Sequence, residues 1–374
     1  MTKGNINLNE IENPFLYPIP SSVSLNSNVT WFSDEQFHEV QLAMRNISID
    51  ALIKALYDEA PTVAVKGCDL KTFVKRLYNG AHQTLISDVI KPTLKFLNFE
   101  GSNKNSSGNC LITTANLKNG HVKGVRLIHD IVRALLDIGF EGQFIYLIGG
   151  FPTPNSFEIQ WAAVPYSFKV FMFVTAQKNG CENVLWIDGQ LFPINDLTPI
   201  FRSIEENGAL LDHGTDCDST DEMNERFILA GTRALLLNLT GIDVVKKSHI
   251  FSIVMGLKVT SPLVQSFVDE FYDMVRRGTP FLSLFPEEYV FGAILYQPKY
   301  SSLHGLSPAL RLLVESLTLL NRTKISFHSL FARKKLFKYD LPVLGGFEDL
   351  HINQRYKNEG YFFIELARNR TMST

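Results

Sequence analysis

The sequence predicts an α/β fold in which a mixed, mostly parallel sheet is flanked by helices and preceded by a helical N-terminal region. From residue 110 onward, short apolar runs alternate with segments whose apolar residues recur at helical spacing. One run, VLWI at residues 184–187, is apolar throughout. Such a run is typical of a strand that is buried on both faces, as in a parallel sheet covered by helices.

The composition is that of an ordinary globular protein. The chain has 374 residues, of which 45% are hydrophobic and 20% charged, so it can bury a large core. The formal net charge of -2 gives no general attraction to nucleic acid, and we expect no nucleic-acid partner. No run approaches the roughly 20 apolar residues of a transmembrane segment. Peripheral membrane contact is one interpretation of the basic segment 332–339, ARKKLFKY, and an exposed helix end is the other.

The cysteines are Cys68, Cys110, Cys181 and Cys217. They are far apart and form no CxxC pair, so their spacing indicates neither a zinc site nor a disulfide framework. The first 20 residues lack the apolar core of a secretory signal. Together these features predict a cytoplasmic protein.

The first part of the chain divides into an extended arm and a helical region. Residues 1–30 are rich in Asn, Pro and Ser, which favours an extended arm. In residues 31–105 the best helix is SIDALIKALYDEA, residues 48–60, and more helix is expected in residues 70–97. The polar segment GSNKNSSGN, residues 101–109, is the clearest boundary in the chain.

Residues 106–300 show the order strand, helix, strand. The first strand is expected at 110–117, a helix at 124–140 and a second strand at 143–150. A βαβ unit of this kind makes its two strands parallel and its crossover right-handed.

The later elements follow from similar signals. A helix is expected over residues 165–180, although FKVFMFV by itself also fits a strand. VLWID then forms a third strand, and a short helix follows over residues 194–208. The segment 261–278 has a Ser N-cap, a Pro in the first turn, an apolar stripe and a closing Gly, which predict a helix. Residues 301–374 form a mixed region, with helix around 308–320 and short strands that end in YFFIELA.

The acid that ends the buried run is the first candidate for function. Asp188 follows the third strand directly, and open α/β sheets bind ligands at the carboxyl ends of their strands. The motifs GxGxxG, GxxxxGK[ST] and GxSxG are absent from the sequence. The alternative is that Asp188 and Gly189 simply form a turn.

Three segments in this order resemble nucleotide-sugar-dependent glycosyltransferases of the GT-A fold. They are residues 110–150, residues 165–201 with PYSFK and VLWIDGQ, and residues 250–281. The likeness is to bacterial and viral members whose middle segment reads approximately PYxFK, then VLWLDxS. It implies a GT-A-like, nucleotide-sugar-binding region from about residue 106 to 300, and transfer of a sugar from a nucleotide-sugar donor to a hydroxyl of a glycan or similar acceptor.

The resemblance also implies roles for single residues. Thr113 and Thr114 would lie near the donor nucleotide, and Lys169 would face its diphosphate, unless it is a surface lysine. Asp188 would be the first acid of a DxD-type element, and Gly189 would let the backbone approach the ligand.

A divalent metal, Mn²⁺ or Mg²⁺, is the implied cofactor, because such ions neutralise the leaving diphosphate. Asp188 would bind it together with Gln190, which stands where the second acid is expected. An amide is a poorer ligand than a carboxylate, so metal dependence is open. A literal DxD at residues 216–218 is a second candidate metal site, and His213 is a further candidate ligand; both lie in the acidic loop 212–225. The alternative is that these clustered charges form a solvated loop and that the lone histidine binds no metal.

Glu287 and Glu288, in the segment FPEEYVFG, are the candidate catalytic residues. They fall where such enzymes often present an acid toward the acceptor, and one of them would act as general base for a sugar hydroxyl. The alternative is that Pro-Glu-Glu is only the N-terminus of a helix.

Two other functions compete with the transferase. A sugar-nucleotide nucleotidyltransferase would carry a Gly-rich, basic loop after the first strand, and residues 113–124, TTANLKNGHVKG, are a weak version of one. A catalytically degenerate transferase fold that serves binding or assembly would explain Gln190.

Overall fold

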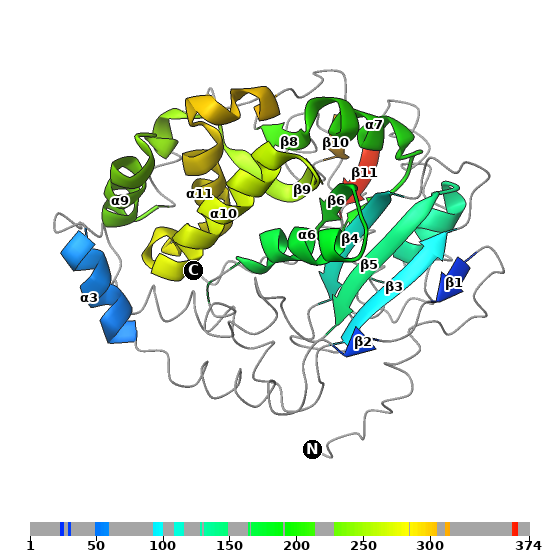
Figure 1. Cartoon of the computed structure of the whole chain (residues 1–374), viewed down its shortest axis with the longest axis horizontal. Coiled ribbons are helices and arrows are strands. Elements are labelled where there is room, and N and C mark those ends of the chain that lie inside the picture. Colours follow the sequence, from blue (N-terminus) through cyan, green and yellow to red (C-terminus); the bar gives the residue numbers. More distant parts are fainter. Residues whose placement is uncertain are drawn as a thin grey trace, which may run out of the picture.

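The computed structural model in Figure 1 describes part of the chain in detail. The described residues are 23–25, 29–30, 49–59, 93–99, 108–115, 128, 131–148, 164, 166–189, 191–213, 228–283, 285–304, 311–314 and 361–365. The segments predicted at 70–92 and 332–339, and the acidic loop after residue 213, lie outside them.

A large mixed sheet runs through the described part of the molecule (Figure 1). Its strands are β1 (Val23–Leu25), β2 (Val29–Thr30), β3 (Thr93–Phe99), β4 (Asn109–Ala115), β5 (Gly142–Ile148), β6 (Asn183–Ile187), β8 (Ala209–His213) and β9 (Ile250–Lys258). They lie in the order β1-β3-β5-β4-β6-β9-β8, and β2 also pairs with β3. The expected α/β fold with a mixed sheet is confirmed.

Parallel pairing is confined to the centre of this sheet. β4 pairs in parallel with both β5 and β6, as the predicted βαβ unit requires. The pairs that β3 makes with β1, β2 and β5, and that β9 makes with β6 and β8, are antiparallel. The sheet is therefore less parallel than the alternation of elements predicted, because its outer strands are added in the antiparallel sense.

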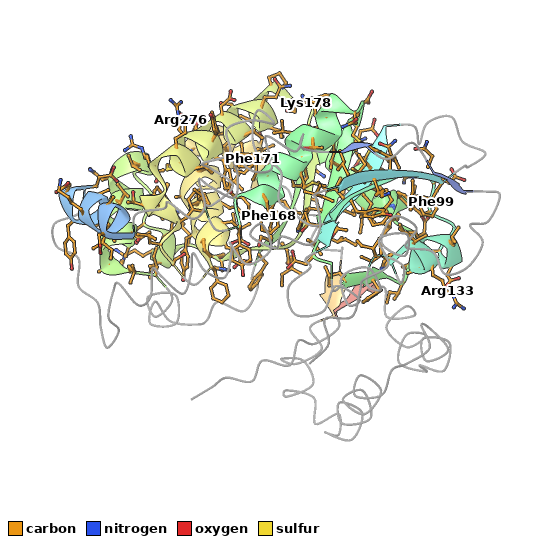
Figure 2. All side chains as sticks on the ribbon, turned by 90° about the horizontal axis from the view of Figure 1, so that it is seen from below. Phe99, Arg133, Phe168, Phe171, Lys178 and Arg276 are labelled. Carbon is orange, nitrogen blue, oxygen red and sulfur yellow. A yellow bond between two sulfur atoms is a disulfide. The ribbon has the colours of Figure 1, made fainter. Side chains whose placement is uncertain are left out.

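Helices cover both faces of the sheet. The described helices are α3 (Ile49–Glu59), α6 (Phe168–Lys178), α7 (Thr198–Asn207), α9 (Ala230–Thr240), α10 (Pro262–Arg277) and α11 (Pro286–Leu295), with 3-10 turns η3 (Val244–Lys246), η4 (Thr279–Phe281) and η5 (Pro298–His304). Residues 131–137 are also helical. Figure 2 shows the helical residues around Arg133 on the opposite side of the sheet from α6, which carries Phe168 and Phe171. The helices predicted around residues 48–60, 124–140, 165–180, 194–208 and 261–278 are confirmed where the structure describes them.

The strand β6 lies between two hydrophobic cores. Val184 and Trp186 belong to the core that contains α6, α10 and α11, whereas Leu185 and Ile187 belong to the core that contains residues 131–135 and α7. All five residues of β6 are buried. The prediction of a strand buried on both faces is confirmed.

The strand β3 corrects the prediction that helix continues to residue 97. Leu94 and Phe96 pack in one core, and Leu97 and Phe99 pack in the other. This alternation suits a strand with two buried faces, and β3 pairs with β5 along its whole length. The division of the chain into four regions stays a prediction, but the sheet takes strands from both sides of residues 101–109.

A second, three-stranded sheet joins the end of the chain to its middle. β7 (Leu191–Pro193) pairs with β11 (Tyr361–Glu365), which also pairs with β10 (Arg311–Val314). The strand expected in YFFIELA is confirmed. The helix expected around 308–320 is wrong at residues 311–314, because this run pairs in parallel with β11 instead.

Cys110 and Cys181 form a disulfide, although the cysteine spacing indicated no disulfide framework. The two residues are 71 positions apart, and their Cα atoms lie 5.9 Å from each other. The parallel pairing of β4 with β6 brings them together, because Cys110 pairs with Val184, three residues after Cys181. The cysteine spacing therefore gives no support to the expected cytoplasmic setting, which stays a prediction.

No helix in the described ranges is long and apolar enough to cross a lipid bilayer.

Candidate functional site

The candidate site lies where β4 and β6 end and β9 begins. Because β9 runs antiparallel to β6, its first residues reach the edge at which the two parallel strands finish. The backbone N–H of Asp188 donates to the carbonyl of Ile253 at 2.9 Å, and the hydroxyl of Thr113 donates to the carbonyl of Ile187 at 2.7 Å. These bonds fix the carboxyl end of β6 between its two neighbouring strands.

Asp188 is partly buried and held by two donors. Its Oδ1 accepts a hydrogen bond from the indole Nε1 of Trp186 at 3.0 Å and lies 3.1 Å from the Nζ of Lys169. Its side chain is 19% exposed. The backbone N–H of Leu191 donates to the carbonyl of Asp188 at 2.9 Å, so the residue also begins a turn. Both interpretations of Asp188 and Gly189 are therefore compatible: the turn holds the carboxylate at the edge of the sheet.

Lys169 is a buried lysine at the start of α6, so the surface interpretation is wrong. Its side chain is 4% exposed, and its Nζ lies 3.0 Å from the Oε1 of Glu287. The ammonium also donates to Ser252, to the hydroxyl at 2.7 Å and to the carbonyl at 3.2 Å. Burial alone would lower the pKa of Lys169, but the neighbouring acids Asp188, Glu287 and Glu288 raise it above the ordinary value. The lysine is thus charged and neutralises part of the acidic cluster.

Glu287 and Glu288 stand in the first turn of α11 and are both buried. Glu287 contacts Lys169 and the hydroxyl of Ser252, the latter at 2.6 Å. The Oε1 of Glu288 accepts the backbone N–H of Ser252 at 3.0 Å, and its Oε2 lies 2.5 Å from the Nε2 of His249. The two acids do occupy a helix N-terminus, as the alternative proposed, but their side chains belong to the same polar cluster as Lys169.

The two carboxyl groups have different acidities. Burial raises the pKa of Glu287 above its usual value, and the nearby carboxylate of Glu288 adds to this effect. Burial would raise the pKa of Glu288 as well, but the hydrogen bond and charge of His249, with Lys169, hold it below the usual value. The pair therefore separates into one acid that keeps its proton more readily and one that stays ionised.

Sequence reasoning missed Ser252 and His249. Ser252 is completely buried and lies on β9, whose sequence IFSIVMGLK is otherwise largely apolar. A single hydroxyl in such a strand was the available signal. His249 lies next to the rings of Phe251, Phe285 and Tyr289, with centroid distances between 5.1 and 5.8 Å. No sequence motif surrounds it, so only the fold connects it with Glu288.

Gly189 has a structural reason to be glycine. A Cβ placed there would lie 3.2 Å from the backbone oxygen of Thr114, on β4. Close packing of the turn against β4 is thus enough to explain the residue, and its approach to a ligand stays a prediction. Thr113 uses its hydroxyl to tie β4 to β6, and the expected role of Thr113 and Thr114 near a nucleotide also stays a prediction.

The described residues contain no group of three or more His, Cys, Asp or Glu side chains that could hold a metal ion. Gln190, the side chain of His213 and residues 216–218 lie outside the described part. Of the candidate metal ligands, Asp188 is therefore the one whose side chain lies in the described part of the structure.

Comparison with known proteins gives little further information. No family model matches the chain, and no curated protein does. One solved structure, mouse xyloside xylosyltransferase 1 in its apo form, aligns with a TM-score of 0.32 and 12% sequence identity over 52% of this chain and 83% of that chain. At these values the likeness determines neither the fold nor the activity of this protein.

Proposed function

We propose that the protein is a glycosyltransferase that moves a sugar from a nucleotide-sugar donor to a hydroxyl of a glycan or similar acceptor. The observation that supports this most is the polar cluster at the carboxyl edge of β4 and β6. Burying Glu287 and Glu288 beside Asp188 and one lysine is unfavourable for stability. Buried groups with shifted pKa values, as found for Lys169, Glu287 and Glu288, are typical of functional sites.

The burial and contacts of each residue indicate its role. Asp188 is the most exposed of the three acids that surround Lys169, so it is the group that faces the donor. Lys169 positions Asp188 and Glu287 by binding both, and it contributes positive charge beside the donor diphosphate. Glu287 or Glu288 accepts the proton from the acceptor hydroxyl.

A divalent metal fits this site only together with the diphosphate. The Oδ1 of Asp188 already accepts from Trp186 and Lys169, and the described residues offer no hydrogen bond to its Oδ2. Mg²⁺ is commonly held by one or two carboxylates with substrate phosphates and water. We therefore propose that Asp188, with Gln190 as a weaker ligand, holds a Mn²⁺ or Mg²⁺ ion that neutralises charge on the leaving diphosphate.

The proposal is tested by thermal unfolding of the purified protein with UDP, GDP, CMP and their sugars, each with and without Mn²⁺. A ligand at about 100 times its Kd stabilises the folded state by about 2.7 kcal/mol, which is readily measured. We expect one nucleotide class to raise the melting temperature, and Asp188→Asn to abolish this rise while keeping the side chain's shape.

A matched control is Asp243→Asn, because Asp243 is also partly buried and paired with a cation, Arg233, but lies outside the cluster. The control should respond to the nucleotide as the unchanged protein does. If no nucleotide stabilises the protein, the transferase is rejected. A third outcome is that a nucleotide stabilises the protein, but no nucleotide sugar is cleaved to release its nucleotide when acceptors are added. This outcome would favour a binding protein with a degenerate site.

A further inference from the structure

The hydroxyl of Ser252 has three neighbours at hydrogen-bond distance. They are the Nζ of Lys169 at 2.7 Å, the Oε1 of Glu287 at 2.6 Å and the Oε1 of Glu288 at 3.0 Å. A hydroxyl has one hydrogen to donate and two lone pairs to accept with. Lys169 can only donate, so it occupies one lone pair. The single hydrogen of Ser252 can then satisfy one of the two carboxyl groups, and the other must donate to Ser252.

A carboxyl group donates only when it carries a proton, so the question is which of the two does. Glu288 already accepts the backbone N–H of Ser252 on one oxygen and lies 2.5 Å from His249 on the other. Both neighbours favour the charged form. Glu287 has one neighbour that favours its charged form, the Nζ of Lys169 at 3.0 Å, and this ammonium is shared with Asp188 and Ser252. Its Oε1 lies 2.6 Å from the serine hydroxyl, within the range of O–H···O bonds in either direction.

We infer that Glu287 and Glu288 form a proton-sharing pair, in which the proton resides on Glu287 while Ser252 and His249 hold Glu288 in its charged form. In this arrangement Glu287 donates to Ser252, Ser252 donates to Glu288, and His249 donates its Nε2–H to Glu288. Ser252 and His249 are thus positioning residues for the acid pair. The opposite directions of the two pKa shifts agree with this assignment.

The other charged and titratable groups around the pair fit the same arrangement. Lys169 contacts Glu287 from α6 and links it to Asp188 on the other side. Tyr289, the next residue of α11, makes an edge-to-face contact with His249. Burial, together with the charge of Glu288, raises the pKa of Tyr289, so its phenol stays neutral. One lysine then faces two carboxylates and one neutral acid, instead of three carboxylates.

The proton on Glu287 has a consequence for catalysis that rests on the proposed function. Glu287 can take a proton from an acceptor hydroxyl only after it has released its own. Because its pKa is raised, this release occurs at higher pH than for an ordinary glutamate, and the rate should rise with pH through that range.

The inference is tested by infrared spectroscopy of the carboxylic acid C=O band in the unliganded protein at neutral pH. We expect a band that disappears in Glu287→Gln and persists in Glu270→Gln. Glu270 is the matched control because it also binds a lysine and a tyrosine, but its pKa is lowered by Lys299, Tyr300 and Gln297 despite partial burial, so it carries no proton. Loss of the band in Glu288→Gln alone would overturn the assignment, as would its absence from the unchanged protein.

A second variant tests the part played by His249. His249→Phe keeps an aromatic ring between Phe251 and Phe285 but removes the donor to Glu288. Without this donor, Glu288 should take up a proton. The double variant His249→Phe, Glu287→Gln should therefore show a carboxylic acid band, which the single variant Glu287→Gln lacks. Failure of the band to return would exclude the role given to His249.

The fold of Glu287→Gln is itself informative. A neutral amide is close in shape to a neutral acid, so the variant should fold; a variant that fails to fold contradicts the inference. Because the infrared measurement needs no substrate, an acid band without any nucleotide binding would reject the transferase and leave the proton-sharing pair standing.

Discussion

The two ends of the central parallel strands are built from different chemistry. At the amino ends of β4, β5 and β6, amide side chains form hydrogen bonds between strands, and a disulfide joins Cys110 to Cys181. The amide of Gln143 donates to Asn98 at 2.9 Å, and the amide of Asn183 donates to Asn109 at 3.2 Å. At the carboxyl ends, Asp188 belongs instead to a buried cluster with a lysine and two glutamates.

The two edges of the sheet differ in how far stability explains their composition. A neutral hydrogen-bonded edge closed by a covalent bond contributes to stability without burying charge. A cluster of buried acids around one lysine stabilises the fold poorly, since hydrophobic residues of similar size would do as well or better. The carboxyl edge of the sheet is therefore the end whose composition stability alone does not explain.

The largest expected effect concerns Lys169. Lys169→Met leaves Asp188 and the two buried glutamates without their cation, and removing one partner of a buried ion pair typically costs about 3–5 kcal/mol. Urea unfolding at neutral pH measures this loss. Lys299→Met is the control: its partner Glu270 and the lysine itself are partly exposed, so the loss there should be below about 1 kcal/mol. Equal losses for the two variants would contradict the contrast between a buried cluster and a surface pair.

The next effect concerns the disulfide at the amino edge. Reduction of a bond that closes a loop of 71 residues should lower the free energy of unfolding by about 2–4 kcal/mol. Thermal unfolding with and without reductant measures it, and the double variant Cys110→Ser, Cys181→Ser should be insensitive to reductant. The response to nucleotide should survive reduction, because the bond lies at the opposite edge from Asp188; its loss would show that the two edges are coupled.

The smallest effect concerns Gly142, at the start of β5. Its φ is +141°, and a Cβ placed there would lie 2.5 Å from the backbone oxygen of Asn109. Gly142→Ala should destabilise the fold by about 1–3 kcal/mol, because it combines backbone strain with a backbone clash. Gly180→Ala has a positive φ of +86° but open space around the added Cβ, so its loss should be smaller. A comparison of the two melting temperatures tests whether the amino edge is closely packed.

The sequence by itself determined the central elements and the place of Asp188. The apolar run of β6 and the helical spacing in α10 are local signals, and local burial patterns are sufficient to predict them. An acid directly after a buried strand also predicted a polar residue at the carboxyl edge. Lys169, Glu287 and Glu288 were proposed instead from the resemblance of their segments to glycosyltransferases, and no local pattern indicated them.

The tertiary structure alone decided what these residues do to each other. Ser252 and His249 join the site because β9 runs antiparallel to β6, which no local pattern in residues 249–252 indicates. The strand β3 depends in the same way on partners in β5 that are 43 to 55 residues away, and the disulfide on a partner 71 residues away. Pairing across a sheet is a long-range property, and the charge state of a buried acid depends on the groups that pairing brings beside it.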